Sequence, residues 1–197
     1  VNLATTNVIF IGDNGTPQNV IQTPYTAAHS KETLYEGGIR VPLIIAGPAV
    51  VSPNRTSTTR VNCADLYSTI LELAGINVTA TQPVANPLDS RSLLPILQNT
   101  ESGGRTAFSQ EFSADLATSV SGRVLTDDAG YALLAFDDGH EEFYATATDA
   151  NETTNLLGST ISLTAQAAYA ALKVQLASFQ TGSTPNESLL TSWFTRN

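Results

Sequence analysis

Three residues in the first part of the chain could take part in chemistry. Asp13 and Asn14 follow the apolar run of residues 7–11 after a single glycine, and both carry oxygens of the kind that bind Ca²⁺ or Mg²⁺. Lys31, one of only two lysines, could neutralise negative charge on an oxyanion, and His29 could line the same pocket. Simpler interpretations remain open, because Asp-Asn-Gly is a common turn sequence and a single lysine is usually solvated. Two oxygens also cannot complete a Ca²⁺ site, which takes about six to eight.

The residues after Lys31 could shape a binding loop. Gly37 and Gly38 carry no Cβ, so the backbone there could approach a ligand closely. Arg40 could instead be a structural partner for Glu36. Residue types alone therefore leave both a functional and a structural loop open.

The composition is that of a globular protein with an acidic balance. The chain has 197 residues, of which 42% are hydrophobic, so one to two domains are expected. A net charge of -9 without any run of Lys or Arg argues against nucleic-acid binding. No apolar stretch approaches the roughly 20 residues of a membrane span. Cys63 is the single cysteine, and we expect it to be a buried, inert helix residue.

The first hundred residues are predicted to form part of an α/β layer. Residues 7–11 and 41–46 are apolar runs that end at turns, which predicts buried strands and favours a parallel sheet. Residues 64–74 carry apolar side chains at helical spacing, with Asn62 as the N-cap and Gly75 as the stop. The later elements of this part are a linker over residues 83–89 and a short helix over residues 92–97.

Beyond about residue 102 the pattern changes to short strands between hairpin turns. The sequences Asp-Asp-Ala-Gly at 127–130 and Asp-Asp-Gly-His at 137–140 are typical hairpin turns. An amphipathic helix over residues 162–178 is predicted to cover the resulting antiparallel sheet. The strands are predicted at residues 107–109, 123–126, 131–136 and 142–144, and the helix residues that face the sheet are Ala168, Leu172, Leu176 and Phe179.

The order of several motifs resembles that of the type I sulfatases, members of the alkaline-phosphatase-like superfamily. Residues 9–15, Ile-Phe-Ile-Gly-Asp-Asn-Gly, followed by residues 31–42 resemble the second signature of that family. The block Lys-x-Thr-x-x-Glu-Gly-Gly-x-Arg over residues 31–40 is the specific part of the match. Further matches, in the family's order, lie at residues 48–53, 61–75, 88–95, 142–144, 149, 152 and 155–156.

The resemblance implies a role for each matching residue. Asp13 and Asn14 would be two oxygen ligands of a divalent cation, Ca²⁺ or Mg²⁺, whose other ligands lie upstream of this chain. Lys31 would be the catalytic residue that contacts the sulfate group, because S–O cleavage leaves negative charge that a lysine and a cation stabilise. The residues that would shape the loop behind Lys31 are Glu36, Gly37, Gly38 and Arg40.

The family's nucleophile is absent from this sequence. It is a formylglycine made from the first residue of a Cys/Ser-x-Pro-x-Arg motif, and residues 51–55, Val-Ser-Pro-Asn-Arg, place valine at that position. The resemblance therefore implies the carboxyl-terminal portion of a sulfatase, whose partner is the missing amino-terminal portion. We expect the isolated chain to be inactive.

The expected fold class is α/β. Residues 1–100 would be part of an alkaline-phosphatase-like α/β sheet, and residues 101–180 a small antiparallel sheet subdomain with a covering C-terminal helix. Residues 181–197 would be a C-terminal tail, with Trp193 and Phe194 docked on the core.

Two alternatives to a sulfatase remain open at this point. One is a phosphonate or phosphate monoester hydrolase of the same superfamily, which shares the Asp-Asn pair. The other is a non-catalytic binding or assembly module. Low lysine content and the acidic balance favour an exported protein, periplasmic or extracellular, and the sequence leaves the choice of sulfate ester open.

Overall fold

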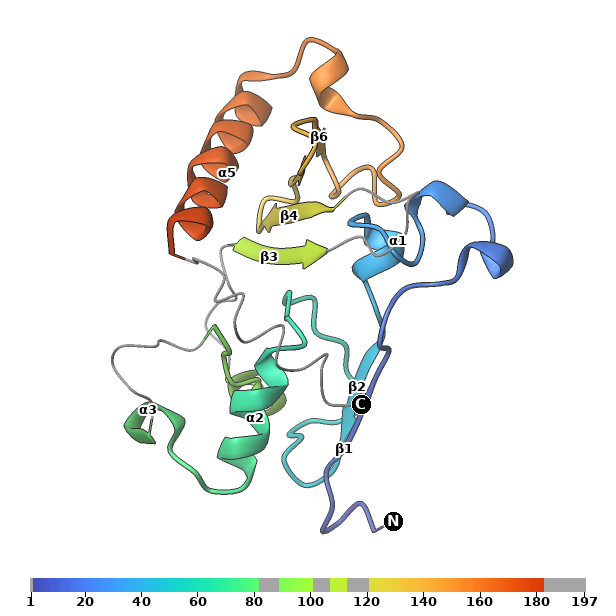
Figure 1. The fold of residues 1–197 in the computed structure, drawn as a ribbon. Coiled ribbons are helices and arrows are strands. Elements are labelled where there is room, and N and C mark those ends of the chain that lie inside the picture. Colours follow the sequence, from blue (N-terminus) through green and yellow to red (C-terminus); the bar gives the residue numbers. More distant parts are fainter. Residues whose placement is uncertain (1, 82–88, 101–106, 113–120, 183–197) are drawn as a thin grey trace, which may run out of the picture.

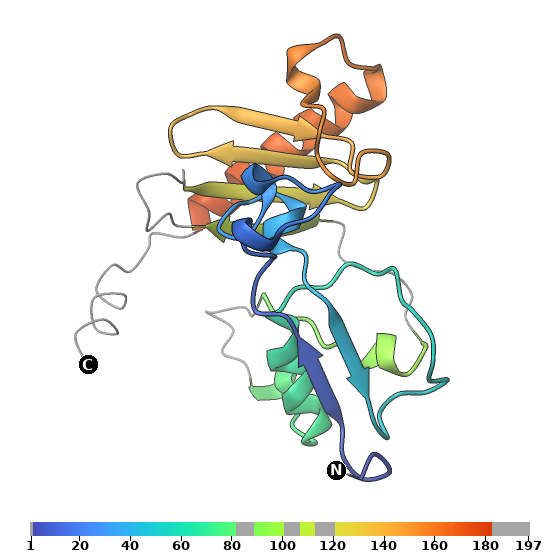
Figure 2. The same cartoon turned by 90° about the vertical axis from the view of Figure 1, so that its right-hand side faces the viewer.

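The computed structural model describes residues 2–81, 89–100, 107–112 and 121–182, and these form two parts. One part is built on a two-stranded ribbon with short helices beside it (Figure 1). The other is a four-stranded sheet with a long helix on one side (Figure 2). The mixed α/β architecture and the antiparallel sheet with its C-terminal helix confirm the predicted fold class.

The ribbon pairs β1 (Val8–Ile11) with β2 (Leu43–Ala46). Both apolar runs are strands, as predicted, but the predicted parallel pairing and burial are wrong for the described residues. The two strands are antiparallel, and the opposed pair Phe10 and Ile44 is 56% and 61% exposed. An apolar run indicates a strand without fixing its partner, because strand direction depends on the connection. Here the connecting loop returns the chain to the end at which β1 stops.

Helix α2 (Asp65–Leu73) has the predicted boundaries within a residue or two. Its N-cap is Ala64, so the prediction of Asn62 as the N-cap is wrong: the Asn62 side chain accepts the Ala64 N–H at 2.9 Å in the turn before the helix. Gly75, with a φ of +80°, lies just beyond the end, as predicted. Cys63 is exposed, so the expectation of a buried helix cysteine is wrong. The reason is its position in the turn that precedes the helix.

Polar side chains form the buried side of α2. Asp65 Oδ1 accepts the Arg91 N–H at 2.8 Å, and Thr69 Oγ1 accepts the Leu93 N–H at 2.8 Å. These bonds hold the segment before α4 against α2, while Ile70 is 53% exposed. The short helices of this part are α3 (Val78–Thr81) and α4 (Leu94–Leu97), the latter within the predicted range.

The sheet is an antiparallel meander in the order β3-β4-β5-β6. Its strands confirm the predicted pattern, and the two hairpin turns lie where the sequence predicts them. Gly130 and Gly139 have φ values of +84° and +92°, which explains glycine in each turn. The strands are β3 (Ala107–Phe112), β4 (Gly122–Asp127), β5 (Ala132–Phe136) and β6 (Glu141–Tyr144).

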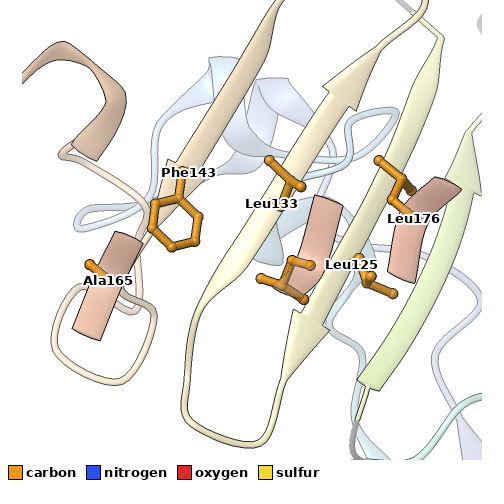
Figure 3. Close-up of a cluster of buried hydrophobic side chains, with 6 residues drawn as sticks. Leu125, Leu133, Phe143, Ala165 and Leu176 are labelled. Atoms are coloured by element: carbon orange, nitrogen blue, oxygen red, sulfur yellow. The ribbon is translucent and has the colours of Figure 1, made fainter. Parts of the chain in front are cut away.

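One face of this sheet packs against helix α5 (Leu163–Gly182), as predicted. Side chains alternate between the two faces of a strand, so one residue in two points toward the helix. Leu172 and Leu176 of α5 are buried there, whereas the side chain of Phe179 lies outside the described residues. The sheet residues of this cluster are Leu125, Leu133 and Phe143, which lie beside Ala165 and Leu176 in Figure 3.

The opposite face of the sheet packs against the loop between β1 and β2. No local pattern in the sequence predicts this contact. Leu34, only 1% exposed, inserts among side chains of β4, β5 and β6. Helix α1 (Glu36–Ile39) follows, and it lies on the side of the sheet away from α5 (Figures 1 and 2). The sheet residues of this second cluster are Val124, Ala132, Leu134 and Tyr144.

Other predicted features lie outside the described residues. These are most of the linker over residues 83–89, and the tail with Trp193 and Phe194. Within the described part of the chain, the model contains no helix with the length and apolarity needed to span a membrane. The remaining helical turns are η1 (Gln18–Val20), η2 (Ala27–His29) and η3 (Leu156–Gly158).

Candidate functional site

Asp13 and Asn14 form a turn two residues after the end of β1. The Asn14 amide donates to Asp13 Oδ2 at 2.6 Å, so the two side chains are in direct contact. Their oxygens are donors that suit Ca²⁺ or Mg²⁺. No group of three or more His, Cys, Asp or Glu residues that could hold a metal exists among the described residues. The pair carries oxygens of the type that a cation site uses, and these two residues alone do not make up such a site.

The backbone of the Lys31 loop is bonded to this turn. Lys31 N–H donates to Thr16 O at 2.9 Å, and Gly15 N–H donates to Gly38 O at 2.8 Å. Within the described ranges, no carboxylate pairs with the Lys31 ammonium, which is partly exposed. The structure thus brings Lys31 next to the segment that carries Asp13 and Asn14.

Glycines at three positions make this contact possible. A Cβ on Gly15 would lie 1.9 Å from Gly37 O, and a Cβ on Gly37 would lie 2.1 Å from His29 O. A Cβ on Gly38 would lie 2.4 Å from Thr33 O. In the described structure, each of these glycines allows one backbone segment of the chain to lie close to another.

Glu36 and Arg40 form the structural pair that the sequence suggests. Their side chains approach to 3.6 Å, one helical turn apart, and the Arg60 guanidinium lies 4.0 Å from the other Glu36 oxygen. Arg40 is 73% exposed, so its pair contributes at most about 1 kcal/mol. The backbone N–H of Glu36 makes a further contact, to the buried carboxyl of Glu152.

His29 lies beside Lys31 in sequence, but its ring stacks on Tyr35. The two ring centroids are 3.6 Å apart, with 11° between the planes. Tyr35 in turn donates its hydroxyl to Glu142 Oε2 at 2.7 Å, across the sheet interface. One face of the His29 ring is therefore covered by Tyr35.

Two carboxylates of the C-terminal part reach this loop without having been assigned a role from the sequence. Glu142 Oε2 also accepts the Tyr144 hydroxyl at 2.8 Å, and burial raises the pKa of both tyrosines that it binds. Glu152, which is 2% exposed, accepts the Glu36 N–H at 2.6 Å. Burial raises the pKa of Glu152 to about 8, against the lowering effect of that N–H. Both positions are among those that the resemblance matches, but neither periodicity nor composition gave them a role.

Solved structures with the alkaline-phosphatase-like fold match most of the chain. One, described as bound to its substrate D-glucosamine-2-N,6-O-disulfate, matches with a TM-score of 0.69 and 22% identity over 89% of this chain and 34% of that chain. A phosphonate monoester hydrolase of Agrobacterium radiobacter matches with a TM-score of 0.56 and 24% identity, over 78% of this chain and 31% of that chain. These matches, all below 25% identity, show that the chain shares part of the fold of these structures.

Sequence comparison narrows the class to a family. The family model described as Sulfatase matches residues 2–76. A sulfatase of Formosa agariphila is 34% identical over 165 residues, which is 77% of this chain and 29% of the relative. The human N-acetylglucosamine-6-sulfatase is 38% identical over 96 residues, which is 49% of this chain and 16% of that protein. The chain belongs to the sulfatase family, and it spans less than a third of the length of these relatives.

Proposed function

We propose that the chain supplies part of the divalent-cation and sulfate site of a sulfuric ester hydrolase. The observation that carries the proposal is the pair of backbone hydrogen bonds, donated by the Gly15 and Lys31 amides, between the Asp13–Asn14 turn and the Lys31 loop. These bonds bring two oxygen donors and an ammonium group to neighbouring segments. Membership of the sulfatase family supports the same assignment.

Each residue of the site has a distinct role in this proposal. Asp13 and Asn14 bind Ca²⁺ or Mg²⁺ through their side-chain oxygens. When bound, the cation supplies positive charge where negative charge accumulates on the sulfuryl oxygens. Lys31 binds the sulfate group and offsets the same charge as the S–O bond breaks. His29 lines the pocket beside Lys31.

The loop behind Lys31 acts through its shape. The residues that we propose to hold it are Glu36, Gly37, Gly38 and Arg40. The glycines allow the backbone contacts described above, and the two charged residues pair across one turn of α1. Their part is to fix where the Lys31 ammonium can reach.

The remaining parts of the site are proposed to come from elsewhere. The formylglycine nucleophile and the other cation ligands would belong to an amino-terminal portion, which is the main partner of this chain. In agreement, the chain covers 29% of the Formosa agariphila sulfatase. We therefore propose that the isolated chain is inactive toward sulfate esters, and that the complete protein is exported to the periplasm or the extracellular space.

A phosphonate or phosphate monoester hydrolase is the second candidate. It is favoured by the match to the phosphonate monoester hydrolase of Agrobacterium radiobacter, at 24% identity. The Sulfatase family model over residues 2–76 and the 34% identical sulfatase of Formosa agariphila favour the sulfatase. Hydrolysis of 4-nitrophenyl sulfate and of a 4-nitrophenyl phosphonate by the same preparation separates the two, and faster phosphonate turnover would reverse the order.

The two lysines provide a matched test of the proposed site. The protein is purified as it occurs, with any chain that accompanies it, and assayed with 4-nitrophenyl sulfate and Ca²⁺. Lys31→Ala should lower kcat/KM by a factor of about 100 or more, because it removes a charge aimed at the developing anion. Lys173→Ala removes a lysine that pairs with Glu141 on the far side of the sheet, and it should leave kcat/KM within about twofold. Equal effects of the two changes would contradict the proposal.

A further inference from the structure

Glu152 is a buried acid at an unusual backbone position. It ends the turn that starts at Asp149, whose carbonyl accepts the Glu152 N–H at 3.0 Å. Its φ of +53° lies in the left-handed region, which a side chain such as glutamate rarely adopts. Within the described part of the chain, no lysine, arginine or histidine forms an ion pair with it. A strained backbone and a buried acid without a cation together indicate a constraint beyond simple packing.

The side chain of Glu152 ends on the backbone of the site loop. Its Oε2 accepts the N–H of Glu36, the first residue of α1, at 2.6 Å. The first N–H groups of a helix have no partner within the helix, so this bond satisfies a group that would otherwise be unpaired. The carboxyl is therefore attached to the backbone of α1 and not to a mobile side chain.

Helix α1 connects Glu152 to the turn that carries the proposed cation ligands. Gly38, two residues after Glu36, accepts the Gly15 N–H at 2.8 Å, next to Asn14. Glu152 and Asn14 are thus linked through two hydrogen bonds and one turn of helix. A shift of α1 toward or away from Glu152 moves the carbonyl on which the Asn14 turn is held.

A second set of contacts keeps α1 near the sheet but does not replace this bond. Leu34 is buried in the cluster beneath the loop, and the Tyr35 hydroxyl reaches Glu142 at 2.7 Å. Both contacts are made by side chains before α1 begins. Ile39 of α1 also packs against this cluster through its side chain, whereas Glu152 contacts the backbone at the first residue of the helix.

We propose that Glu152 is a positioning residue for the cation and sulfate site, because its carboxyl oxygen fixes α1 and thereby the turn of Asp13 and Asn14. The inference rests on the proposed function of that turn. The C-terminal part of the chain, after β6, would then set the geometry of a site whose ligands all lie before β2. Burial among the carboxylates of Glu36, Asp149 and Glu142 supports a protonated Glu152 near neutral pH, so an amide of the same shape should replace it.

The test compares three variants in the protein as it occurs. Ca²⁺ affinity is measured by titration calorimetry, and kcat and KM are measured with 4-nitrophenyl sulfate. Glu152→Ala removes the acceptor, and we expect Ca²⁺ to bind about tenfold more weakly and kcat/KM to fall by a similar factor. Glu152→Gln keeps an oxygen acceptor and should rescue both to within about twofold. Glu141→Ala is the control. It breaks the contacts of Glu141 to Tyr169 and Lys173 of α5, and it should leave both the Ca²⁺ affinity and kcat/KM within about twofold of wild type.

The outcomes separate this inference from the proposed function. If wild type neither binds Ca²⁺ nor hydrolyses the ester, the proposed function fails, and the inference falls with it. If wild type does both and Glu152→Ala does too, only the inference is overturned. Failure of Glu152→Gln, or equal loss in Glu141→Ala, overturns it as well, because general destabilisation would then explain the result. If Glu152→Ala does not fold, Glu152→Asp takes its place, since a shorter carboxyl cannot reach the Glu36 N–H and should show the same weakening.

Discussion

The pH dependence of stability provides a direct measure of the proton on Glu152. Its pKa is raised from a usual value near 4.5 to about 8, mainly by burial and further by the carboxylates of Glu36, Asp149 and Glu142. Between these two values the folded chain holds one more proton at this position than the unfolded chain. Stability must therefore fall as pH rises through this window, and the contribution levels off above the folded pKa.

The magnitude follows from the number of protons. A difference of one proton changes the free energy of unfolding by about 1.4 kcal/mol per pH unit. From about pH 5 to about pH 7 the expected loss is roughly 2 to 3 kcal/mol, because the unfolded carboxyl is not yet fully ionised at the lower pH. Glu152→Gln cannot ionise, so this contribution to the pH dependence disappears in the variant.

Urea unfolding of wild type and Glu152→Gln at both pH values is the assay. The other titrating groups are common to the two proteins, so the difference between their free energies isolates Glu152. We expect the variant to gain roughly 2 to 3 kcal/mol relative to wild type between about pH 5 and about pH 7. Parallel curves for the two proteins would refute the assignment of a proton to this buried acid.

Three further predictions concern packing and backbone contacts. Gly15→Ala should lower the free energy of unfolding by about 1–3 kcal/mol or more, because the added Cβ would lie 1.9 Å from Gly37 O; thermal unfolding measures this, and an unchanged Tm would contradict the close contact. Leu133→Ala should lower the free energy of unfolding by about 2–5 kcal/mol, because Leu133 is fully buried. Leu163 is 83% exposed, so Leu163→Ala should cost no more than about 0.5 kcal/mol, and equal losses in urea unfolding would contradict the burial of Leu133. Asp65→Ala should cost about 1–3 kcal/mol, because two backbone N–H groups lose their acceptor, and a neutral result would show that water replaces it.

Local signals account for most of the fold that the sequence predicts. The hairpin turns contain glycines with positive φ at positions 130 and 139, and such turns are determined by a few adjacent residues. Helix α2 follows a turn in which the Asn62 side chain accepts the Ala64 N–H, and it has a left-handed glycine at its end. None of these features depends on a distant part of the chain.

Features that depend on distant contacts could not be predicted in the same way. The apolar run of β1 is a strand, yet nothing in it indicates that β2 would pair antiparallel or that Phe10 would be exposed. Leu34 lies in a polar segment, and its burial depends on a sheet about a hundred residues later. A local pattern cannot reveal what the other face of a sheet contacts.

The same distinction between local signals and distant contacts applies to the candidate site. The resemblance identified Asp13, Asn14 and Lys31 as candidates, and the structure brings their segments together through backbone bonds. The resemblance also includes Glu152 among its matches but gave it no role, and a single acid in a loop carries no periodic signal that would suggest one. From the sequence, Gly37 and Gly38 could serve either a ligand or the structure of the loop. In the described structure, they allow close contact between backbone segments.

The central claim is that this chain provides cation ligands to a sulfatase site, and the Ca²⁺ dependence of turnover tests it most directly. The protein is stripped of metal, and hydrolysis of 4-nitrophenyl sulfate is followed as Ca²⁺ is added to wild type, Asp13→Asn and Asp128→Asn. Asp128, in the exposed hairpin turn after β4, is the matched control. Asp13→Asn should require at least about tenfold more Ca²⁺ for half-maximal turnover, because it removes a charged ligand, whereas Asp128→Asn should match wild type. An unchanged Ca²⁺ requirement in Asp13→Asn would contradict the claim.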